Sequence, residues 1–160
     1  MFGDNRVYTQ MFRIMPRDIS FVLGHNSNKL DRIRYITNAE ITLKYPVKGT
    51  EDYMTPYFLI QSKNAYAVEF STYLLTEETT KAITKSNGMN YDSITIRKSK
   101  VPIIIGKNGN EVRSFKRDMN LSSLVVSDHP YDIELSVIKM IGNNLVHVIR
   151  EFKCRYSNIL

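Results

Sequence analysis

The chain carries one short pattern twice, and this repetition constrains its fold more than any other feature. The fuller copy lies in Val101–Asn120, where the apolar run Val101–Ile105 leads into Gly106–Gly109 (GKNG) and then into a basic segment. Two glycines three positions apart let the backbone bend sharply and approach a ligand closely. We expect one helix to end at Gly106 and another to begin near Asn110, with free backbone N–H groups directed into the bend.

The second copy of the pattern lies 82 positions earlier, with Gly24 in the place of Gly106. An apolar run precedes Gly24 and a polar helix start follows it, although Ser27 stands where the fuller copy has Gly109. The flanking apolar positions also agree: Phe12, Ile14, Leu30 and Ile33 correspond to Ile94, Ile96, Val112 and Phe115. A period of this length is about one small domain. We therefore expect two domains, at residues 1–86 and 87–160.

The composition is that of an ordinary globular protein. Apolar residues make up 42% of the chain, the formal net charge is +6 and the sequence pI is about 9.4. Excess positive charge favours an anionic partner, but it does not by itself specify nucleic acid. The single cysteine, Cys154, excludes an intramolecular disulfide and fits a reducing compartment. The sequence contains no signal-peptide pattern and no apolar run that would span a membrane, so we expect an intracellular protein, cytoplasmic with the nucleus left open.

Hydrophobic periodicity and turn residues predict the same order of elements in both halves: strand, helix, loop, helix, strand, strand, helix. In the first half we expect strands at Gln10–Met15, Glu40–Leu43 and Tyr57–Gln61, and helices at Arg17–Leu23, from Asn28 onwards and at Asn64–Leu75. In the second half we expect strands at Asp92–Arg97, Leu124–Ser127 and Ile133–Met140, and helices at Val101–Ile105, at Asn110–Met119 and, after a cap at Asn143, up to about Tyr156.

The connections and the buried helix faces are predicted from the same patterns. Tyr45–Pro56 is expected to be a long loop, and Thr76–Asn90 a short linker. The first half of this linker could extend the preceding helix through Lys81 or Ile83, and Ser86-Asn87-Gly88 should break that helix. Asn28 is expected to cap its helix. Apolar spacing predicts three buried stripes: Leu30, Ile33 and Ile36; Tyr66, Phe70 and Leu74; and Leu145, Ile149, Phe152 and Tyr156.

This order of elements around a glycine loop resembles the type I KH (K homology) domain family. The resemblance implies an α+β fold with two tandem domains, each a three-stranded antiparallel sheet with three helices on one face. The type II arrangement needs an extra helix and strand before the helix pair, and only about ten residues precede the first predicted strand. The resemblance is stronger in the second half, where IIGKNG is followed by V-x-x-F. It is weaker in the first, where Ser27 replaces the second glycine and His25 takes a position that is usually basic.

In KH domains about four single-stranded nucleotides lie in a groove beside the GxxG loop. The resemblance implies that the phosphates are held by Gly106, Lys107, Asn108 and Gly109. The apolar floor, or the core beneath it, is expected from Ile104, Ile105, Val112 and Phe115, and the opposing strand edge from Leu124 and Val126. Electrostatic steering is expected from Arg113, Lys116 and Arg117. A weaker second site is expected at Gly24, His25, Asn26, Ser27 and Lys29.

The sequence offers no pattern for catalysis, and we expect no enzyme activity, metal or cofactor. The three histidines, His25, His129 and His147, are scattered, and no nucleotide-binding or nucleophile motif occurs. Glu77-Glu78 is expected to be a solvated pair in the linker. Two functions remain: a module that binds single-stranded RNA, with single-stranded DNA left open, or a structural protein that uses KH-like domains for contacts with other proteins or with copies of itself.

Overall fold

The computed structural model describes residues 5–45 and 55–158, and the chain divides into two compact units, at residues 1–83 and 84–160. Each unit contains one three-stranded antiparallel sheet together with helices. The expected α+β class with two such sheets is thus confirmed. The predicted boundary after Ser86 lies close to the division after Ile83, and the assignment of two repeated domains stays a prediction. Most of the expected loop Tyr45–Pro56 lies outside the described residues.

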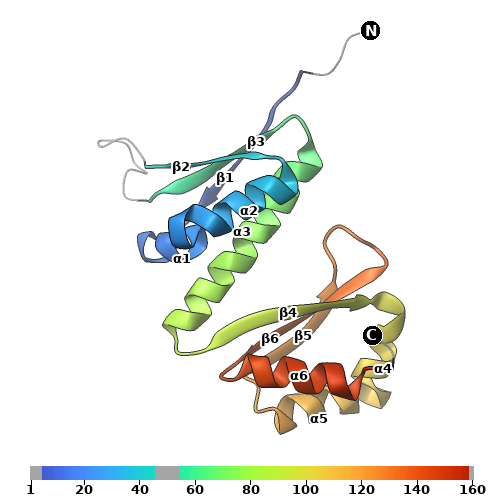
Figure 1. The fold of residues 1–160 in the computed structure, drawn as a ribbon. Helices are drawn as coiled ribbons and strands as arrows, with labels where there is room; N and C mark the ends of the chain where they lie inside the picture. Colours follow the sequence, from blue (N-terminus) through green and yellow to red (C-terminus); the bar gives the residue numbers. More distant parts are fainter. Residues whose placement is uncertain (1–4, 46–54, 159–160) are drawn as a thin grey trace. The chain divides into compact units, whose positions relative to one another are not determined.

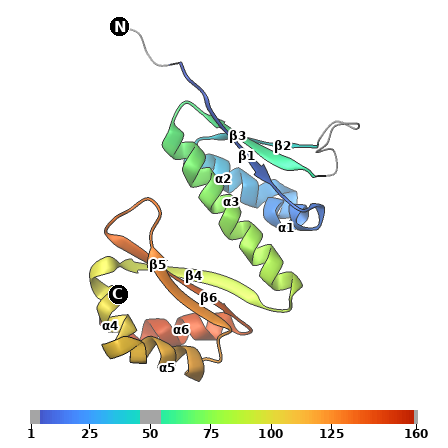
Figure 2. The ribbon, with the colours of Figure 1, turned by 180° about the vertical axis from the view of Figure 1, so that it is seen from behind.

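The first unit has the order strand, helix, helix, strand, strand, helix. Its elements are β1 (Tyr8–Arg13), α1 (Ile19–Leu23), α2 (Asn28–Thr37), β2 (Glu40–Lys44), β3 (Tyr57–Ser62) and α3 (Ala65–Ser86). Strand β3 lies between β1 and β2, and the three helices cover one face of the sheet (Figures 1 and 2). Strand β1 begins before the predicted Gln10, because Tyr8 and Thr9 pair with Ser62 and Gln61, and it ends before Met15.

The core of the first unit lies between the sheet and its helices. Phe58 and Ile60 on β3 are fully buried, and they share a face because alternate residues of a strand point the same way. Val22 of α1, Leu30 of α2 and Leu75 of α3 are buried in the same cluster. The sheet and all three helices of this unit therefore contribute to one core, which fixes the position of the turn between α1 and α2.

The predicted buried face of α3 is wrong by one position. The buried residues of its first half are Ala67, Val68, Ser71 and Leu75, whereas Tyr66 is half exposed. Small side chains suit a helix that approaches its sheet closely, and the hydroxyl of Ser71 is satisfied by the Ala67 carbonyl at 2.8 Å. The aromatic rings instead stack on one another along the neighbouring face of the helix, with centroids 5.9 Å apart for Tyr66 and Phe70.

Helix α2 departs from prediction at both ends. Thr37, not Ile36, completes the buried stripe with Leu30 and Ile33, and its hydroxyl donates to the Ile33 carbonyl at 2.8 Å. Ile36 is about half exposed, at 48%. The expected cap, Asn28, is the first helical residue, and the capping position belongs to Ser27, whose side chain makes no capping hydrogen bond. This difference follows from the tight loop that enters the helix.

The segment predicted as a linker is mostly helical. Helix α3 continues for 22 residues to Ser86, and the chain then turns at Asn87 and Gly88. The backbone N–H groups of these two residues donate to Thr84 and Lys85 at 3.1 and 3.0 Å. The break expected at Ser86-Asn87-Gly88 is therefore confirmed, and α3 ends three residues beyond Ile83, the furthest extension expected.

The second unit has the same order of elements as the first. They are β4 (Asn90–Arg97), α4 (Val101–Ile105), α5 (Asn110–Asp118), β5 (Ser123–Asp128), β6 (Leu135–Gly142) and α6 (Leu145–Arg155). Strand β6 lies between β4 and β5, and the helices again cover one face (Figure 1). Helix α4 has the predicted bounds, whereas β6 begins after the predicted Ile133, which is exposed in a turn closed by a Leu135 N–H to Asp132 carbonyl bond of 3.1 Å.

Helix α6 packs on the second sheet through a face close to the predicted one. Leu145, Phe152 and Tyr156 are buried as expected, but Val148 is buried and Ile149 only partly so. The capping position is Asn144 rather than Asn143. The Phe152 ring meets the ring of Phe115 from α5 edge to face, with centroids 5.6 Å apart. This aromatic pair joins α5 to α6 and so anchors the helix that follows the GKNG loop.

Candidate nucleic-acid interface

The GKNG loop of the second unit is a short turn between α4 and α5 with three residues at positive φ. Gly106 has φ 72° and ψ 179°, a combination that is essentially restricted to glycine. Asn108 and Gly109 follow in the left-handed region, at φ 54° and 73°. The N–H of Gly106 closes α4 by donating to Pro102 at 2.9 Å, and that of Gly109 donates back to the Gly106 carbonyl at 3.2 Å.

The corresponding loop of the first unit has nearly the same backbone conformation. Gly24 has φ 76° and ψ 178°, and Asn26 has φ 51°. Ser27, in the place of Gly109, also adopts the left-handed region, at φ 61° and ψ 23°. The loss of the second glycine has therefore not changed the shape of the turn, and Ser27 bears the conformational cost that a non-glycine residue pays in this region.

Each first glycine is also required by packing. A Cβ atom on Gly106 would lie 2.7 Å from the Cβ of Glu111 and 3.0 Å from its backbone nitrogen. A Cβ on Gly24 would lie 2.7 Å from the Cγ of Lys29, which corresponds in sequence to Glu111. In both units the residue early in the second helix thus lies over the first glycine of the loop.

The side chains that the sequence assigned to phosphate binding lie at the surface. Lys107 and Asn108 are exposed, and the two glycines between which they lie are partly buried. Lys116 and Arg117 are also exposed, on α5. Glu111 adds a carboxylate in the first turn of that helix, which sequence analysis did not consider. The loop therefore presents one cation with an acid on the adjacent turn.

Arg113 contacts the loop directly, in addition to the long-range attraction of nucleic acid expected from its charge. Its guanidinium nitrogen Nη2 donates to the Asn108 carbonyl at 2.5 Å and to the Asn110 side-chain oxygen at 2.8 Å. Arg113 lies three residues after the start of α5. Its two bonds therefore link this helix to the backbone of the loop and to the side chain of the first helical residue. Arg113 is thus placed to hold the loop in shape as well as to contribute charge.

The predicted apolar floor divides into a core and a surface. Ile104 and Phe115 are almost completely buried, so they belong to the core beneath the site. Ile105 and Val112 are only partly buried, as are Leu124 and Val126 on β5. Leu124 and Val126 pack against the core cluster, and they retain exposed surface. The loop, α4, α5 and β5 thus belong to one packed unit.

The candidate loop of the first unit differs in its electrostatics. His25 and Asn26 are exposed, but Lys29 is engaged: its ammonium nitrogen lies 3.4 Å from the Glu78 carboxylate and 3.7 Å from the centroid of the Phe21 ring. Glu78 also lies 3.7 Å from the Lys81 ammonium, and its side chain is 20% exposed. The expectation that Glu77-Glu78 is simply solvated is therefore wrong for Glu78.

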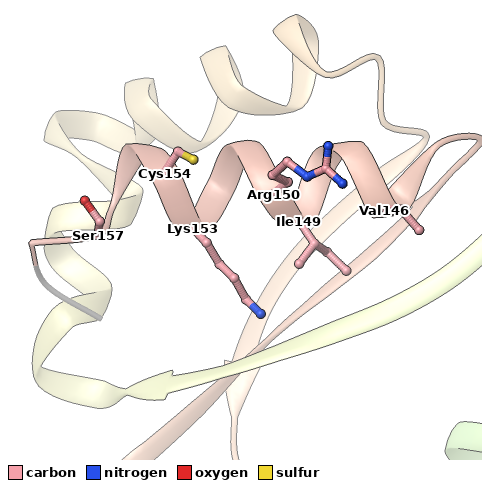
Figure 3. Close-up of a pocket in the computed structure, with 6 residues that line it drawn as sticks. All are labelled: Val146, Ile149, Arg150, Lys153, Cys154 and Ser157. Atoms are coloured by element: carbon pink, nitrogen blue, oxygen red, sulfur yellow. The ribbon is translucent and has the colours of Figure 1, made fainter.

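A shallow surface depression of about 550 Å³, widely open to solvent, lies along α6 (Figure 3). It is lined by Val146, Ile149, Arg150, Lys153, Cys154 and Ser157. The sequence assigned none of these residues to a binding site, and Ile149 was expected in a buried stripe. The alternation of apolar and basic residues along the helix is a signal that could have indicated this face. Cys154 is exposed and forms no disulfide in the described part of the chain.

The described residues contain no group of three or more histidine, cysteine or acidic side chains placed to hold a metal ion. Within the same residues, no helix is both long and apolar enough to span a membrane.

The chain matches no protein-family model and no curated protein. Solved structures that resemble it include Dim2p from Pyrococcus horikoshii OT3. In a crystal structure of the a/eIF2alpha-aDim2p-rRNA complex from that organism, the match is 18% identical, covers 97% of each chain and has a TM-score of 0.40. For Dim2p from the same organism, the match is 19% identical, covers 93% of this chain and 89% of the other, and has a TM-score of 0.37. Values this low do not establish a shared fold or function.

Proposed function

We propose that the chain is a tandem type I KH-like protein that binds single-stranded nucleic acid, RNA in the first instance, through the GKNG loop of its second unit. The observation that carries this proposal is the loop itself. Gly106 adopts a conformation accessible essentially only to glycine, and the exposed Lys107 and Asn108 follow it at the entrance to α5. A backbone bent in this way is suited to close contact with a phosphodiester chain.

The surroundings of the loop support a groove of mixed character. Partly buried Ile105, the last residue of α4, and Val112, in the first turn of α5, supply apolar surface on the two helices that flank exposed Lys107. Arg113 fixes the loop from one side, so that little conformational freedom is lost when a ligand binds. Because neither a backbone clamp nor an apolar groove tests the 2′-hydroxyl, single-stranded DNA is the competing ligand to be measured.

The proposal is tested by comparing matched loop variants in fluorescence anisotropy with short single-stranded RNA and DNA pools at two salt concentrations. Lys107→Asp/Asn108→Asp should lower affinity at least about tenfold, because an exposed cation and a neutral amide are replaced by two anions. The control is His25→Asp/Asn26→Asp, which places two aspartates at the corresponding positions of the first loop and changes the net charge by −2 rather than −3; it should have little effect. Circular dichroism confirms that both variants fold.

Three results would contradict the proposal: no binding by the wild-type chain, equal binding by the wild type and the second-loop variant, or a larger loss in the first-loop variant. The ratio of affinities for the RNA and DNA pools identifies the preferred ligand.

A second candidate function, contact with other proteins, is favoured by the shallow, open depression on α6. This helix presents Val146, which is 74% exposed, beside Arg150 and Lys153 (Figure 3). A partly apolar, basic helix face that lies outside the loop suits a protein partner of complementary charge. Replacing Val146 and Arg150 together should leave nucleic-acid binding unchanged under the first proposal, whereas it should weaken a protein complex under the second.

A further inference from the structure

The first unit contains an ion-pair cluster that joins the first turn of α2, directly after the loop, to the second half of α3. Lys29, in the first turn of α2, lies with its ammonium nitrogen 3.4 Å from Oε2 of Glu78. The contact is an ion pair without hydrogen-bond geometry, and Glu78 Oε1 lies 3.7 Å from the Lys81 ammonium. Glu78 is thus the anion shared by two cations, one of which, Lys29, belongs to the candidate site of the first unit at the start of α2.

The position of Lys29 is fixed by more than this charge. Its Nζ lies 3.7 Å from the centroid of the Phe21 ring, and its aliphatic stem covers Gly24. The side chains of Lys29 and Glu78 are 37% and 20% exposed. A pair that is partly withdrawn from water is screened less by salt than a fully exposed pair. The ammonium group is therefore directed toward α1 and α3, where Glu78 meets it.

The length of α3 is what brings Glu78 to this position. The closing helix of the second unit, α6, has 11 residues, whereas α3 has 22 and continues beyond the sheet of its own unit (Figure 2). Glu78 lies in this added half. In the second unit the position of Lys29 is taken by Glu111, so the same contact has no counterpart there.

We propose that Glu78 is an internal substitute for a phosphate group and keeps the first loop closed to nucleic acid. This inference rests on the proposed function of the GxxG-type loops. Because the turn has the same torsions in both units, the first loop retains the shape of a backbone clamp. Its nearby cation is compensated by Glu78, and a phosphate must displace that carboxylate before it can use Lys29. The loop opens when Glu78 is neutralised or when the added half of α3 moves away.

The test is made in a chain whose second loop is disabled by Lys107→Asp/Asn108→Asp, so that any binding comes from elsewhere. Adding Glu78→Gln should raise affinity for a short single-stranded RNA about fivefold, the effect of roughly one released cation. The salt dependence of log affinity should become steeper by about 0.7, the value for one further phosphate contact on a single strand.

Two variants separate the released cation from a general change in charge. Glu77→Gln alters the net charge equally at the adjacent position and should not reproduce the gain. Lys29→Met added to Glu78→Gln should abolish it. Glu78→Asp keeps the charge but moves the carboxylate away from Lys29, so it should give a smaller gain. It serves as the second test if Glu78→Gln unwinds α3, and circular dichroism detects such unwinding.

The proposal is overturned if the folded Glu78→Gln and Glu78→Asp chains both bind no better than their parent, or if Glu77→Gln gives the same increase. Its failure differs from failure of the proposed function, since the latter is judged by whether the wild-type chain binds through its second loop. If the wild-type chain binds through its second loop but Glu78→Gln gives no gain, only the proposal that Glu78 keeps the first loop closed is wrong. If Glu78→Gln raises affinity in the chain with the disabled second loop, but the wild-type chain binds without needing Lys107, only the assignment of binding to the second loop is wrong.

Discussion

Arg113 donates a hydrogen bond from Nη2 to the backbone carbonyl of Asn108, with a distance of 2.5 Å between the two atoms. The same nitrogen donates to the Asn110 side chain, so one guanidinium joins α5 to the middle of the loop. The corresponding residue of the first unit is Asp31, whose carboxylate instead accepts a hydrogen bond from Arg34 at 2.7 Å. The second loop is therefore supported by a side chain of a kind that the first loop does not have at this position.

Replacing Arg113 by lysine should weaken nucleic-acid binding although the charge is kept. Lysine has no planar fork with which to reach the Asn108 carbonyl and the Asn110 side chain together. Loss of one such bond, worth about 1 kcal/mol, should lower affinity about fivefold. Hydrogen exchange of the amides in residues 107–110 should become faster. The matched control is Arg117→Lys on the same helix, and equal affinities for the two variants would show that Arg113 acts through its charge alone.

The two glycines of the second loop should differ in their tolerance of a methyl group. Gly106→Ala forces an alanine into a glycine-only conformation and places its Cβ 3.0 Å from the backbone nitrogen of Glu111, so it should cost at least about 2 kcal/mol. Gly109→Ala meets the flexible end of Arg113 at 2.9 Å, and its left-handed conformation should cost about 1 kcal/mol. Urea unfolding monitored by circular dichroism measures both, and the reverse ranking would contradict this account.

Much of the order of elements could be predicted because apolar spacing and glycine breaks are local signals. Helix α4 and the break after Ser86 are examples, since each depends on residues adjacent in the chain. The buried face of α3 could not be predicted from the size of its apolar side chains. The helix packs closely on the sheet through small residues such as Ala67 and Ser71, and Tyr66 lies outside this face. Hydrophobicity alone does not distinguish these neighbouring faces.

The electrostatic character of the candidate sites was less predictable than their shape. The GKNG pattern correctly indicated a sharp turn, but the contact between Lys29 and Glu78 joins residues 49 positions apart in sequence. Its formation depends on how α3 packs beside α2, which no local pattern shows, so the sequence interpretation treated both residues as available to solvent or ligand. The role of Arg113 was likewise hidden, because an exposed arginine on a basic helix gives no local signal of a backbone bond.

Ser27→Gly should stabilise the first unit. Ser27 adopts the left-handed region at φ 61°, which costs a non-glycine residue about 1–2 kcal/mol, while glycine loses about 0.5–1 kcal/mol more backbone entropy on folding. The net gain should be about 0.5–1 kcal/mol and should appear as a higher midpoint of thermal unfolding. Ser27→Val, a β-branched residue at the same torsions, is the opposing control and should lower the midpoint. Stabilisation by valine, or none by glycine, would contradict the strain assigned to Ser27.

Tyr156 should make the stability of the second unit depend on pH in the alkaline range. Burial raises the pKa of its hydroxyl, the nearby Glu111 carboxylate raises it further, and the Arg155 guanidinium opposes both effects. Arg155 approaches the hydroxyl without reaching hydrogen-bond geometry, and the oxygen has no hydrogen-bond partner among the described residues. The folded state therefore favours the neutral phenol more strongly than the unfolded chain does.

Because the folded pKa is the higher one, this contribution is complete below the ordinary tyrosine pKa of about 10 and is lost as pH rises through the folded value. Urea unfolding near pH 8 and at about pH 10.5 should show a larger loss of unfolding free energy in the wild type than in Tyr156→Phe. The variant should be about 1 kcal/mol more stable at the lower pH, since it removes a buried hydroxyl that has no partner. Parallel losses in the two proteins would show that the hydroxyl remains hydrated in the folded state.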